Sequence, residues 1–517
     1  MSEQKFNALV LAASFKDTVK LAKDAADQAL VIFPMRPGVC HPLRSDRVQK
    51  ALRSHAKSKE TRLNKHRIEE VFDELDAIAF EEGEVIRPHY RVAPVVGGYL
   101  YNLGAGRFFH VTATEGVSVT TTVPEGVYFT ESSTMVSTPT PEPRPDLSAL
   151  LGWFNCSPVE KLLLVGWLTF VVATPKAAQV PYPILTVRAA AGSGKTFMCS
   201  KVIRQLVDPS SVASQTMPKT IKDVAISAQN SHLIVYDNLR FIRRELSDDL
   251  CKVATGGTVS GRKLYTDGQE YSMDVRCALV LNGIHTFVTE SDLVSRCVNI
   301  TLSPIENEQR QTEAELDAKF ERGLPSLIYT LHVLTAKVLA VKDNVEVRYK
   351  SRMADFSTWL AGLEKVLNIP HGQLQNAYQH NVEQAKIAGV ADDSLFVAML
   401  EFAQRFRGGN PWRGTPHALF EALTSQTSVN PGSDMPRNAS AMSRRLPMLQ
   451  DALASDGVYF KHKRGSERNY EVWFVPKTGK SRDEGDDATN LPVTPTQPSA
   501  QVDAHASDVD AAEELLV

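Results

Sequence analysis

The stretch from Pro181 to Thr196 constrains the chain most, because it joins a strand pattern to a loop of specialised composition. Its sequence is PYPILTVRAAAGSGKT, in which an apolar, β-branched run precedes small residues and then Gly194-Lys195-Thr196. Such a run predicts a buried strand that ends in a tight loop. Glycines let backbone N–H groups approach phosphate oxygens, because no Cβ stands in the way. The stretch therefore predicts a nucleotide-phosphate loop that leads into a helix.

Individual residues of this loop have separate expected roles. We expect Lys195 to reach the β- and γ-phosphates and the Thr196 hydroxyl to ligate Mg²⁺, which makes ATP and Mg²⁺ the expected ligands. The pattern G-x-x-x-x-G-K-[ST] is met except at its first position, where Ala189 stands. The structural alternative is a glycine-rich turn with an incidental lysine. The residues expected to cradle the phosphates are Ala191, Gly192, Ser193, Gly194, Lys195 and Thr196.

Composition bounds the class of protein. The chain has 517 residues, of which 43% are hydrophobic and 23% charged, as is typical of globular proteins with several domains. Its net charge is −3, so any DNA-binding surface must be local. The six cysteines form no C-x-x-C pair, so the sequence indicates neither a zinc site nor a disulfide framework. We therefore expect a reducing, cytoplasmic compartment. We expect no signal peptide and no membrane partner, because the longest apolar run, 162–173, is too short to span roughly 30 Å.

Shifts in composition divide the chain into six segments. Strands alternating with helices predict an α/β core, and a helix–helix–strand–turn–strand order near the C-terminus predicts a winged-helix-like domain. The expected segments are an N-terminal α+β region with a basic stretch and a β-meander (1–131), a Pro/Thr-rich linker (132–146), the α/β core (147–305), a helical region (306–390), the winged-helix-like domain (391–476) and a disordered acidic tail (477–517).

The N-terminal region holds two features whose meaning the sequence leaves open. The stretch from Arg44 to Arg67 is densely basic, with only Asp46 and Glu60 opposing. It fits either a solvated helix face or a contact with the DNA backbone. The short apolar runs 9–13 and 29–33 fit either strand or helix.

Three further apolar runs, 231–239, 275–281 and 298–302, predict strands of a mostly parallel sheet. Ligands of such sheets bind at the carboxyl ends of the strands, where Asp237, Asn238 and Asn282 stand. We expect Asp237 to hold the Mg²⁺ water shell, and Asn282 to orient the attacking water beside the γ-phosphate. Arg296, which precedes the last strand, is a candidate to supply a positive charge to the γ-phosphate of a neighbouring subunit.

The segments after Asp237-Asn238, LCKVATGGTVSGRKLYTDGQEYSMDVRCALVLNGI and DLVSRC, resemble the superfamily 3 helicases and the helicase part of phage and plasmid primase-helicases. The resemblance covers residues 147–302. More weakly, residues 352–356 and the winged-helix-like C-terminal part of this chain are similar to bacterial mobile-element members of the group. It implies an AAA+-type P-loop NTPase core in an ATPase that works as a ring, usually a hexamer, on single-stranded or forked DNA.

The resemblance further implies a hairpin that points into the channel of the ring. It maps onto residues 256–268, with Arg262, Lys263 and Tyr265 near its tip. A lysine meets phosphate and an aromatic ring can stack on a base, whereas the alternative is an ordinary solvated β-turn.

One departure from the family concerns hydrolysis. Asn238 stands where many relatives have a glutamate that polarises water, and asparagine cannot take a proton. Either another acid serves, with Glu245 and Asp248 as candidates, or hydrolysis is slow.

In the C-terminal domain, basic residues of the predicted second helix and wing suit phosphate contacts on either side of a groove. The alternative is a protein-contact module. The residues proposed for DNA contact are Arg444, Arg445, Lys463 and Arg464.

These patterns favour an ATP-dependent, ring-forming DNA helicase or translocase in the replication of a phage, plasmid or integrated mobile element. A separate primase or other replication proteins are expected partners, because the N-terminal region has neither paired carboxylates in a primase-like setting nor a zinc cluster. One alternative is a nucleotide-switched, DNA-binding initiator or loader without processive unwinding. Another is a structural or defence-type ATPase whose C-terminal domain binds protein.

Overall fold

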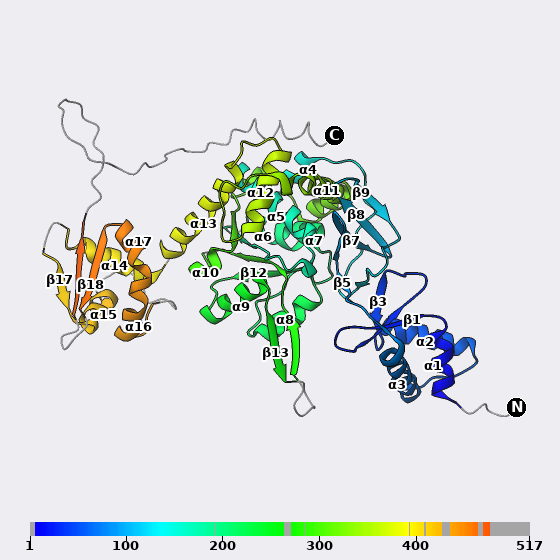
Figure 1. The fold of residues 1–517 in the computed structure, drawn as a ribbon. Helices are drawn as coiled ribbons and strands as arrows, with labels where there is room; N and C mark the ends of the chain where they lie inside the picture. The colour runs from blue at the N-terminus through cyan, green and yellow to red at the C-terminus, as the bar shows by residue number, and fades with distance from the viewer. Residues whose placement is uncertain are drawn as a thin grey trace. The chain divides into compact units, whose positions relative to one another are not determined.

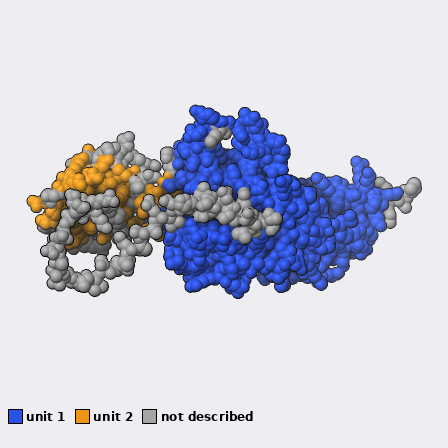
Figure 2. Space-filling view, turned by 90° about the horizontal axis from the view of Figure 1, so that it is seen from above, with its two compact units in different colours: residues 1–285, 295–381, 505–517 blue, residues 286–294, 382–504 orange. Residues whose placement is uncertain are grey.

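The structure is a computed structural model that describes residues 6–190, 192–262, 270–284, 286–391, 393–407, 410–425, 435–463 and 469–475. The chain divides into two compact units (Figure 1, Figure 2). The first takes in the described parts of 1–285 and 295–381, and the second takes in those of 286–294 and 382–504.

The N-terminal part of the first unit is a six-stranded sheet covered by three helices. The run 9–13 lies in a helix, which Asn7 caps by accepting from Val10 N at 3.2 Å, whereas the run 29–33 holds a buried strand paired on both sides. The sheet order is β4-β1-β2-β3-β10-β5. The elements are α1 (Ala8–Lys16), β1 (Lys20–Lys23), β2 (Ala29–Ile32), β3 (Val39–Pro42), α2 (Asp46–Ser58), α3 (Lys65–Glu82), β4 (Glu84–Val85), β5 (His89–Tyr90) and β10 (Phe129–Thr130).

A β-meander follows, as the sequence predicts. Strands β6 (Val92–Val95), β7 (Gly98–Gly104), β8 (Arg107–Thr112) and β9 (Gly116–Thr120) pair antiparallel in chain order. The meander packs on α11 (Glu313–Val341), where the Tyr99 hydroxyl lies 2.7 Å from His332 Nδ1 and the Phe109 ring contacts the same histidine. The meander is therefore part of the core of the first unit (Figure 1).

The segment predicted as a linker, 132–146, lies along this core. Val136 N donates to Pro209 O at 3.0 Å and Thr138 N to Leu103 O at 2.7 Å, and Thr138 is only 1% exposed. Its backbone groups are satisfied by the meander and by the chain after the phosphate loop. The segment connects the two regions, and it is an ordered segment hydrogen-bonded to the rest of the first unit, not a flexible linker.

The α/β core contains the four predicted strands, all parallel, in the order β12-β15-β11-β16. A separate antiparallel pair, β13 and β14, projects away from this sheet (Figure 1). The elements are α4 (Leu147–Leu151), α5 (Pro158–Ala173), β11 (Ile184–Arg188), α6 (Lys195–Phe197), the π-helical η2 (Met198–Ile203), α7 (Arg204–Val207), α8 (Ile221–Gln229), β12 (Leu233–Leu239), α9 (Arg244–Thr255), β13 (Thr258–Arg262), β14 (Glu270–Asp274), β15 (Ala278–Gly283) and β16 (Cys297–Thr301).

Arg91 joins the N-terminal region to this core. Its fully buried guanidinium donates from Nε to Asp208 Oδ1 at 2.8 Å and from Nη2 to Pro209 O at 2.7 Å. Asp208 follows α7, and its other oxygen accepts from His232 N at 2.8 Å, just before β12. Burial would raise the pKa of Asp208, but the charges of Arg91 and Arg204 hold it below its usual value. The network fixes the end of the phosphate-loop helix against the start of β12.

The helical region contains α11, α12 (Ala354–Val366) and the long α13 (Gln373–Ala391). Within the described residues, α11 is the one helix long and apolar enough to cross a membrane. However, 56% of its apolar window is buried inside the protein, and a core helix of this kind passes the same test. The apolar run 162–173 belongs to α5, whose residues Leu162–Val172 are buried.

The second unit has a small core of its own, formed by residues such as Met399, Phe402, Leu423 and Val472. Its three strands form an antiparallel sheet in the order β17-β19-β18. The elements are α10 (Ser291–Val294), α14 (Ser394–Gln404), β17 (Trp412–Gly414), α15 (Pro416–Ser425), α16 (Ala439–Arg445), α17 (Gln450–Ser455), β18 (Val458–Lys463) and β19 (Asn469–Phe474).

Candidate functional site

The predicted phosphate loop connects β11 to the helix that begins at Lys195. Gly192 and Gly194 have φ values of +80° and +74°, a backbone conformation that favours glycine. Ser193 Oγ donates to Ala190 O at 3.0 Å and closes the turn. Ala189, which replaces the first glycine of the pattern, has no positive φ and donates its N–H to Gly283 O at 3.3 Å. Alanine therefore fits this position without strain.

The loop opens onto a helix of three consecutive pieces, α6, η2 and α7. Lys195 is half-buried and Thr196 exposed in its first turn, so both side chains lie beside the loop backbone. The N-terminus of such a helix presents unpaired N–H groups to an anion. Ala191, the remaining predicted cradle residue, lies outside the described residues.

The carboxyl edge of the sheet brings the predicted polar residues together. Asn282, on β15, pairs with Val187 of β11 and is fully buried. Its Oδ1 accepts from Asn238 N at 3.1 Å, and its Nδ2 has no hydrogen-bond partner among the described residues. A buried amide donor in this state is a group that a ligand oxygen would satisfy.

Cys199, in η2, is fully buried. Burial raises the pKa of the Cys199 thiol to about 12, and the Asn282 side chain opposes the shift. The charges of Asp237 and Lys195 act on the same thiol. Asp237 and Asn282 lie on the adjacent strands β12 and β15, and β11, the strand that precedes Lys195, pairs with β15 on its other side.

Asn238 takes a left-handed conformation with a φ of +59° and is exposed. The two acids considered as substitutes for the missing glutamate, Glu245 and Asp248, are exposed on α9. Within the described residues, neither side chain contacts the loop. Their role as a base stays a prediction.

Arg296 lies at the opposite edge of the sheet. Its carbonyl accepts from Ile184 N at 2.9 Å, and Ile184 is the first residue of β11. The phosphate loop starts beyond the last residue of that strand, about 13 Å further on at 3.3 Å per residue. Arg296 is thus placed away from the phosphate loop of its own chain.

Arg310 is a candidate that the sequence analysis missed. The chain after β16 passes over the phosphate loop, so that a Cβ built on Gly192 would lie 3.6 Å from Arg310 Nη2. Ile305 approaches Gly194 in the same way, at 3.4 Å. Arg310 is exposed and follows a short 3-10 turn, in a stretch without periodicity that gives no signal of its own.

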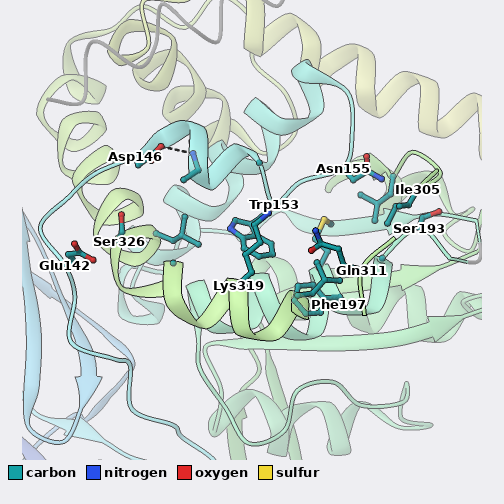
Figure 3. Close-up of a pocket in the computed structure, with 18 of the residues that line it drawn as sticks. Glu142, Asp146, Trp153, Asn155, Ser193, Phe197, Ile305, Gln311, Lys319 and Ser326 are labelled. Carbon is teal, nitrogen blue, oxygen red and sulfur yellow. Dashed lines mark hydrogen bonds between the residues drawn. The ribbon is translucent and has the colours of Figure 1, made fainter. Parts of the chain in front are cut away.

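A cavity of about 790 Å³ adjoins the loop at Ser193 and Gly194 (Figure 3). Its wall carries Trp153 and Phe197, whose rings stack with centroids 6.2 Å apart, and Lys319 Nζ lies 5.5 Å from the Trp153 ring centre. The labelled side chains Asn155 and Gln311 add amide groups (Figure 3). An apolar pocket with a few polar groups suits a planar organic ligand.

The expected Mg²⁺ ligands are Thr196 and Asp237. The described residues contain no cluster of three or more His, Cys, Asp or Glu that could hold a metal. Two protein oxygens fit Mg²⁺ nevertheless, because this ion keeps several waters and takes phosphate oxygens as ligands.

The residues predicted to contact DNA are only partly described. The backbone of Arg262 ends β13 and that of Lys463 ends β18, while Lys263, Tyr265 and Arg464 lie outside the described residues. Arg444 is exposed on α16. Arg445, in contrast, forms an ion pair with Asp393 and is 33% exposed, so its charge is already partly used within the unit.

Apo structures of the NrS-1 C-terminal region are similar to the chain only at a low level. Three of them are 12%, 11% and 13% identical, with 91%, 91% and 92% of this chain and 100% of each of theirs covered. Their TM-scores of 0.37, 0.39 and 0.36 are too low to support an argument about fold or function. None of the curated proteins matches the sequence.

Two family models match successive segments of the chain. Residues 147–384 match the actinomycete integrative conjugative element replication protein family, and residues 395–482 match the C-terminal domain of the same replication protein, AICE RepA. The first match spans the phosphate loop, the parallel sheet and the helical region. Together the two matches indicate a replication protein of an integrative conjugative element.

Proposed function

We propose that this replication protein is an ATP-dependent, ring-forming DNA helicase or translocase with an AAA+-type P-loop NTPase core. One observation carries the proposal: Asp237 on β12 and Asn282 on β15 lie on adjacent strands, and the next strand, β11, leads through a loop with two glycines of positive φ to Lys195. Loop, lysine, acid and polar strand end are the parts that phosphoryl transfer uses to hold and polarise a nucleotide.

Each part has a role that follows from its chemistry. The loop N–H groups and Lys195 bind the phosphates, and the oxygens of Thr196 and Asp237 hold Mg²⁺, which offsets negative charge as the phosphoryl group transfers. The unpaired Nδ2 of Asn282 donates to the γ-phosphate or to the attacking water. Because Arg296 lies at the far edge of the sheet, it serves the site of a neighbouring subunit, which requires a ring or a shorter oligomer.

The cavity beside Ser193 and Gly194 accommodates the base of the nucleotide in this proposal. Trp153 and Phe197 offer apolar ring surface, and Asn155 and Gln311 offer amide groups for the edge of a purine. Asn155 is held by its Nδ2, which donates to Ser303 O at 2.7 Å, so that its carbonyl oxygen remains available as an acceptor.

Lys195→Ala tests the site. ATP turnover should fall at least about a hundredfold, because a preorganised charge at the transferring group is lost. Lys222→Ala, which removes an exposed lysine of α8, is the matched control and should leave turnover unchanged. Wild-type turnover in a folded Lys195→Ala protein would refute the assignment.

A specific observation favours a second candidate, a nucleotide-switched initiator or loader. Asn238 offers no proton acceptor at the strand end, and its N–H is engaged by Asn282. Such a site binds ATP and hydrolyses it slowly, so DNA binding would depend on bound ATP without strand displacement. A displacement assay on forked DNA separates the two, since only a translocase releases the strand.

We further propose that the second unit binds DNA as a winged helix. Its order of helix, strand, two helical segments and two strands, with a three-stranded antiparallel sheet, supports this. Arg444 on α16 is then the leading candidate for a backbone contact, because it is exposed. Binding of a protein in place of DNA remains the alternative for this unit.

A further inference from the structure

We propose that the exposed face of α2 binds the phosphate backbone of double-stranded DNA, at a surface separate from the nucleotide site. The helix buries Val48, Leu52 and Ala56 against the N-terminal core. Its other side exposes four cations, which we call the α2 basic face: Arg47, Lys50, Arg53 and Lys57. At 1.5 Å per residue these cations extend over about 15 Å of helix.

The basic surface continues past the end of the helix. The chain turns at Glu60, which has a φ of +57°, and brings Arg62 back toward the helix. A hollow of about 410 Å³ lies there, lined by Arg53, Lys57 and Arg62 with Glu60, Thr61 and Leu63. Three cations and one carboxylate thus meet at one concave site, whose net charge is positive.

These cations lack intramolecular partners of opposite charge. None of the four residues of the α2 basic face, nor Lys59 or Arg62, takes part in an ion pair with another described residue. Two acids of the neighbouring helix α3, Glu69 and Asp73, pair with Arg44. The Nη1 of Arg53 donates to Leu63 O at 3.3 Å, which orients the guanidinium without neutralising it.

Two histidines near this surface have lowered pKa values, chiefly because they are buried. Burial lowers the pKa of His41 to about 4, and the charges of Arg47 and Arg36 lower it further. Burial also lowers the pKa of His55, with Lys59 acting in the same direction.

The chemistry of the face favours a DNA duplex over other anionic partners. Its exposed residues include no Phe, Tyr or Trp on which unpaired bases could stack, so single strands gain little there. The apolar residues of α2 are buried, which leaves nothing to insert into a lipid surface. A duplex carries one phosphate charge per about 1.7 Å of axis, so the face can neutralise several phosphates at once.

The test compares two triple variants of the full chain. Arg47→Gln/Lys50→Gln/Lys57→Gln removes three charges from the α2 basic face, and glutamine keeps the helix propensity close to that of lysine and arginine. Arg87→Gln/Lys350→Gln/Lys365→Gln removes one arginine and two lysines that are exposed elsewhere in the first unit. Binding of a blunt-ended duplex is measured by fluorescence anisotropy at several salt concentrations.

We expect the first variant to lose at least about tenfold in duplex affinity, and the slope of log K against log salt to shrink by about 2 to 3. The control variant should bind as the wild type does. ATP turnover should be unchanged in both variants, so this result is independent of the test made with Lys195→Ala. Equal affinity and equal slope in the two variants would overturn the proposal. So would unchanged duplex binding together with lost binding to phosphatidylserine vesicles.

Discussion

At the scale of single residues, most side chains of the candidate site can be predicted from the sequence, but one cannot. Lys195 and Thr196 follow a glycine pattern whose physical purpose is evident from the residues alone. Arg310 has no such signal, because it lies in an irregular segment and becomes relevant only where the chain crosses the loop near Gly192. In the proposed function, its guanidinium, which lies close to Gly192, would contact a phosphate oxygen bound by the loop.

Arg310→Ala should therefore weaken ATP binding. A hydrogen bond to a charged group contributes about 1.5–3 kcal/mol, which corresponds to roughly a 10- to 100-fold higher Kd. Titration with a fluorescent, non-hydrolysable ATP analogue measures the change. Arg322→Ala, which removes an exposed arginine of α11, is the control and should bind as the wild type does. Identical affinities for the two variants would exclude Arg310 from the site.

At the scale of elements, the parallel pairing of β11 with β16 separates the two positive charges that we propose for one reaction. Lys195 follows the carboxyl end of β11, whereas Arg296 precedes the amino end of β16. A five-residue strand cannot bring both ends to the same phosphate. An arginine that completes the site of an adjacent subunit is worth roughly 10³–10⁵ in rate in such enzymes.

Arg296→Ala should accordingly abolish turnover while leaving ATP binding intact. Mixing it with Lys195→Ala protein should restore part of the activity, because some interfaces then combine an intact loop with an intact arginine. Neither protein alone should turn over ATP. A mixture that stays inactive, from a protein that remains monomeric at every concentration, would rule out the ring.

We propose that the β13–β14 hairpin serves movement along DNA and does not take part in ATP hydrolysis. It projects from the core after α9, and the predicted contacts Lys263 and Tyr265 follow β13 in the sequence (Figure 1). Lys263→Ala/Tyr265→Ala should keep basal ATP turnover but weaken single-stranded DNA binding, since one stacked base contributes about 1–3 kcal/mol. Strand displacement should fall sharply. Wild-type displacement by the double variant would leave an ordinary turn and favour the loader.

The sequence predicts the elements of the core better than their packing. Strands such as β11 and β12 begin as apolar runs that are followed by small or polar residues, so the sequence predicts their type and approximate ends. The run 9–13 could not be assigned, because only the Asn7 cap and its packing make it a helix. The segment 132–146 has the composition of a linker, but composition does not predict the hydrogen bonds that its backbone forms with distant parts of the chain.

At the scale of the whole molecule, buried histidines couple stability to pH. Burial lowers the pKa of His232 to about 4 and that of His332 to about 3. The unfolded chain protonates both near pH 6.5, so it binds more protons than the folded chain between that pH and the folded values. The free energy of unfolding should therefore decrease as pH falls below 6.5, by up to about 1.4 kcal/mol per pH unit for each histidine.

Urea unfolding at pH 7.5, 6.0 and 5.0 measures this dependence. His332→Gln should flatten it, because a group with a strongly lowered pKa is removed. His66→Gln should not, because the side chain of His66 is 83% exposed. Equal pH dependence in His332→Gln and the wild type would show that His332 titrates normally in the folded protein.

The contact between Arg91 and Asp208 means that the segment shared with the family and the segment able to fold alone have different boundaries. The family match begins at residue 147, yet the ionised carboxylate of Asp208 in that segment depends on the guanidinium of Arg91, which lies 56 positions before the match begins. A fragment of residues 147–384 would leave Asp208 buried without Arg91, a loss of about 3–5 kcal/mol for a broken buried pair. Such a fragment should aggregate or melt well below the intact chain, whereas one that starts at residue 6 should not. A recombination event that moved residues 147–384 into another protein would have to carry Arg91 and the meander with them.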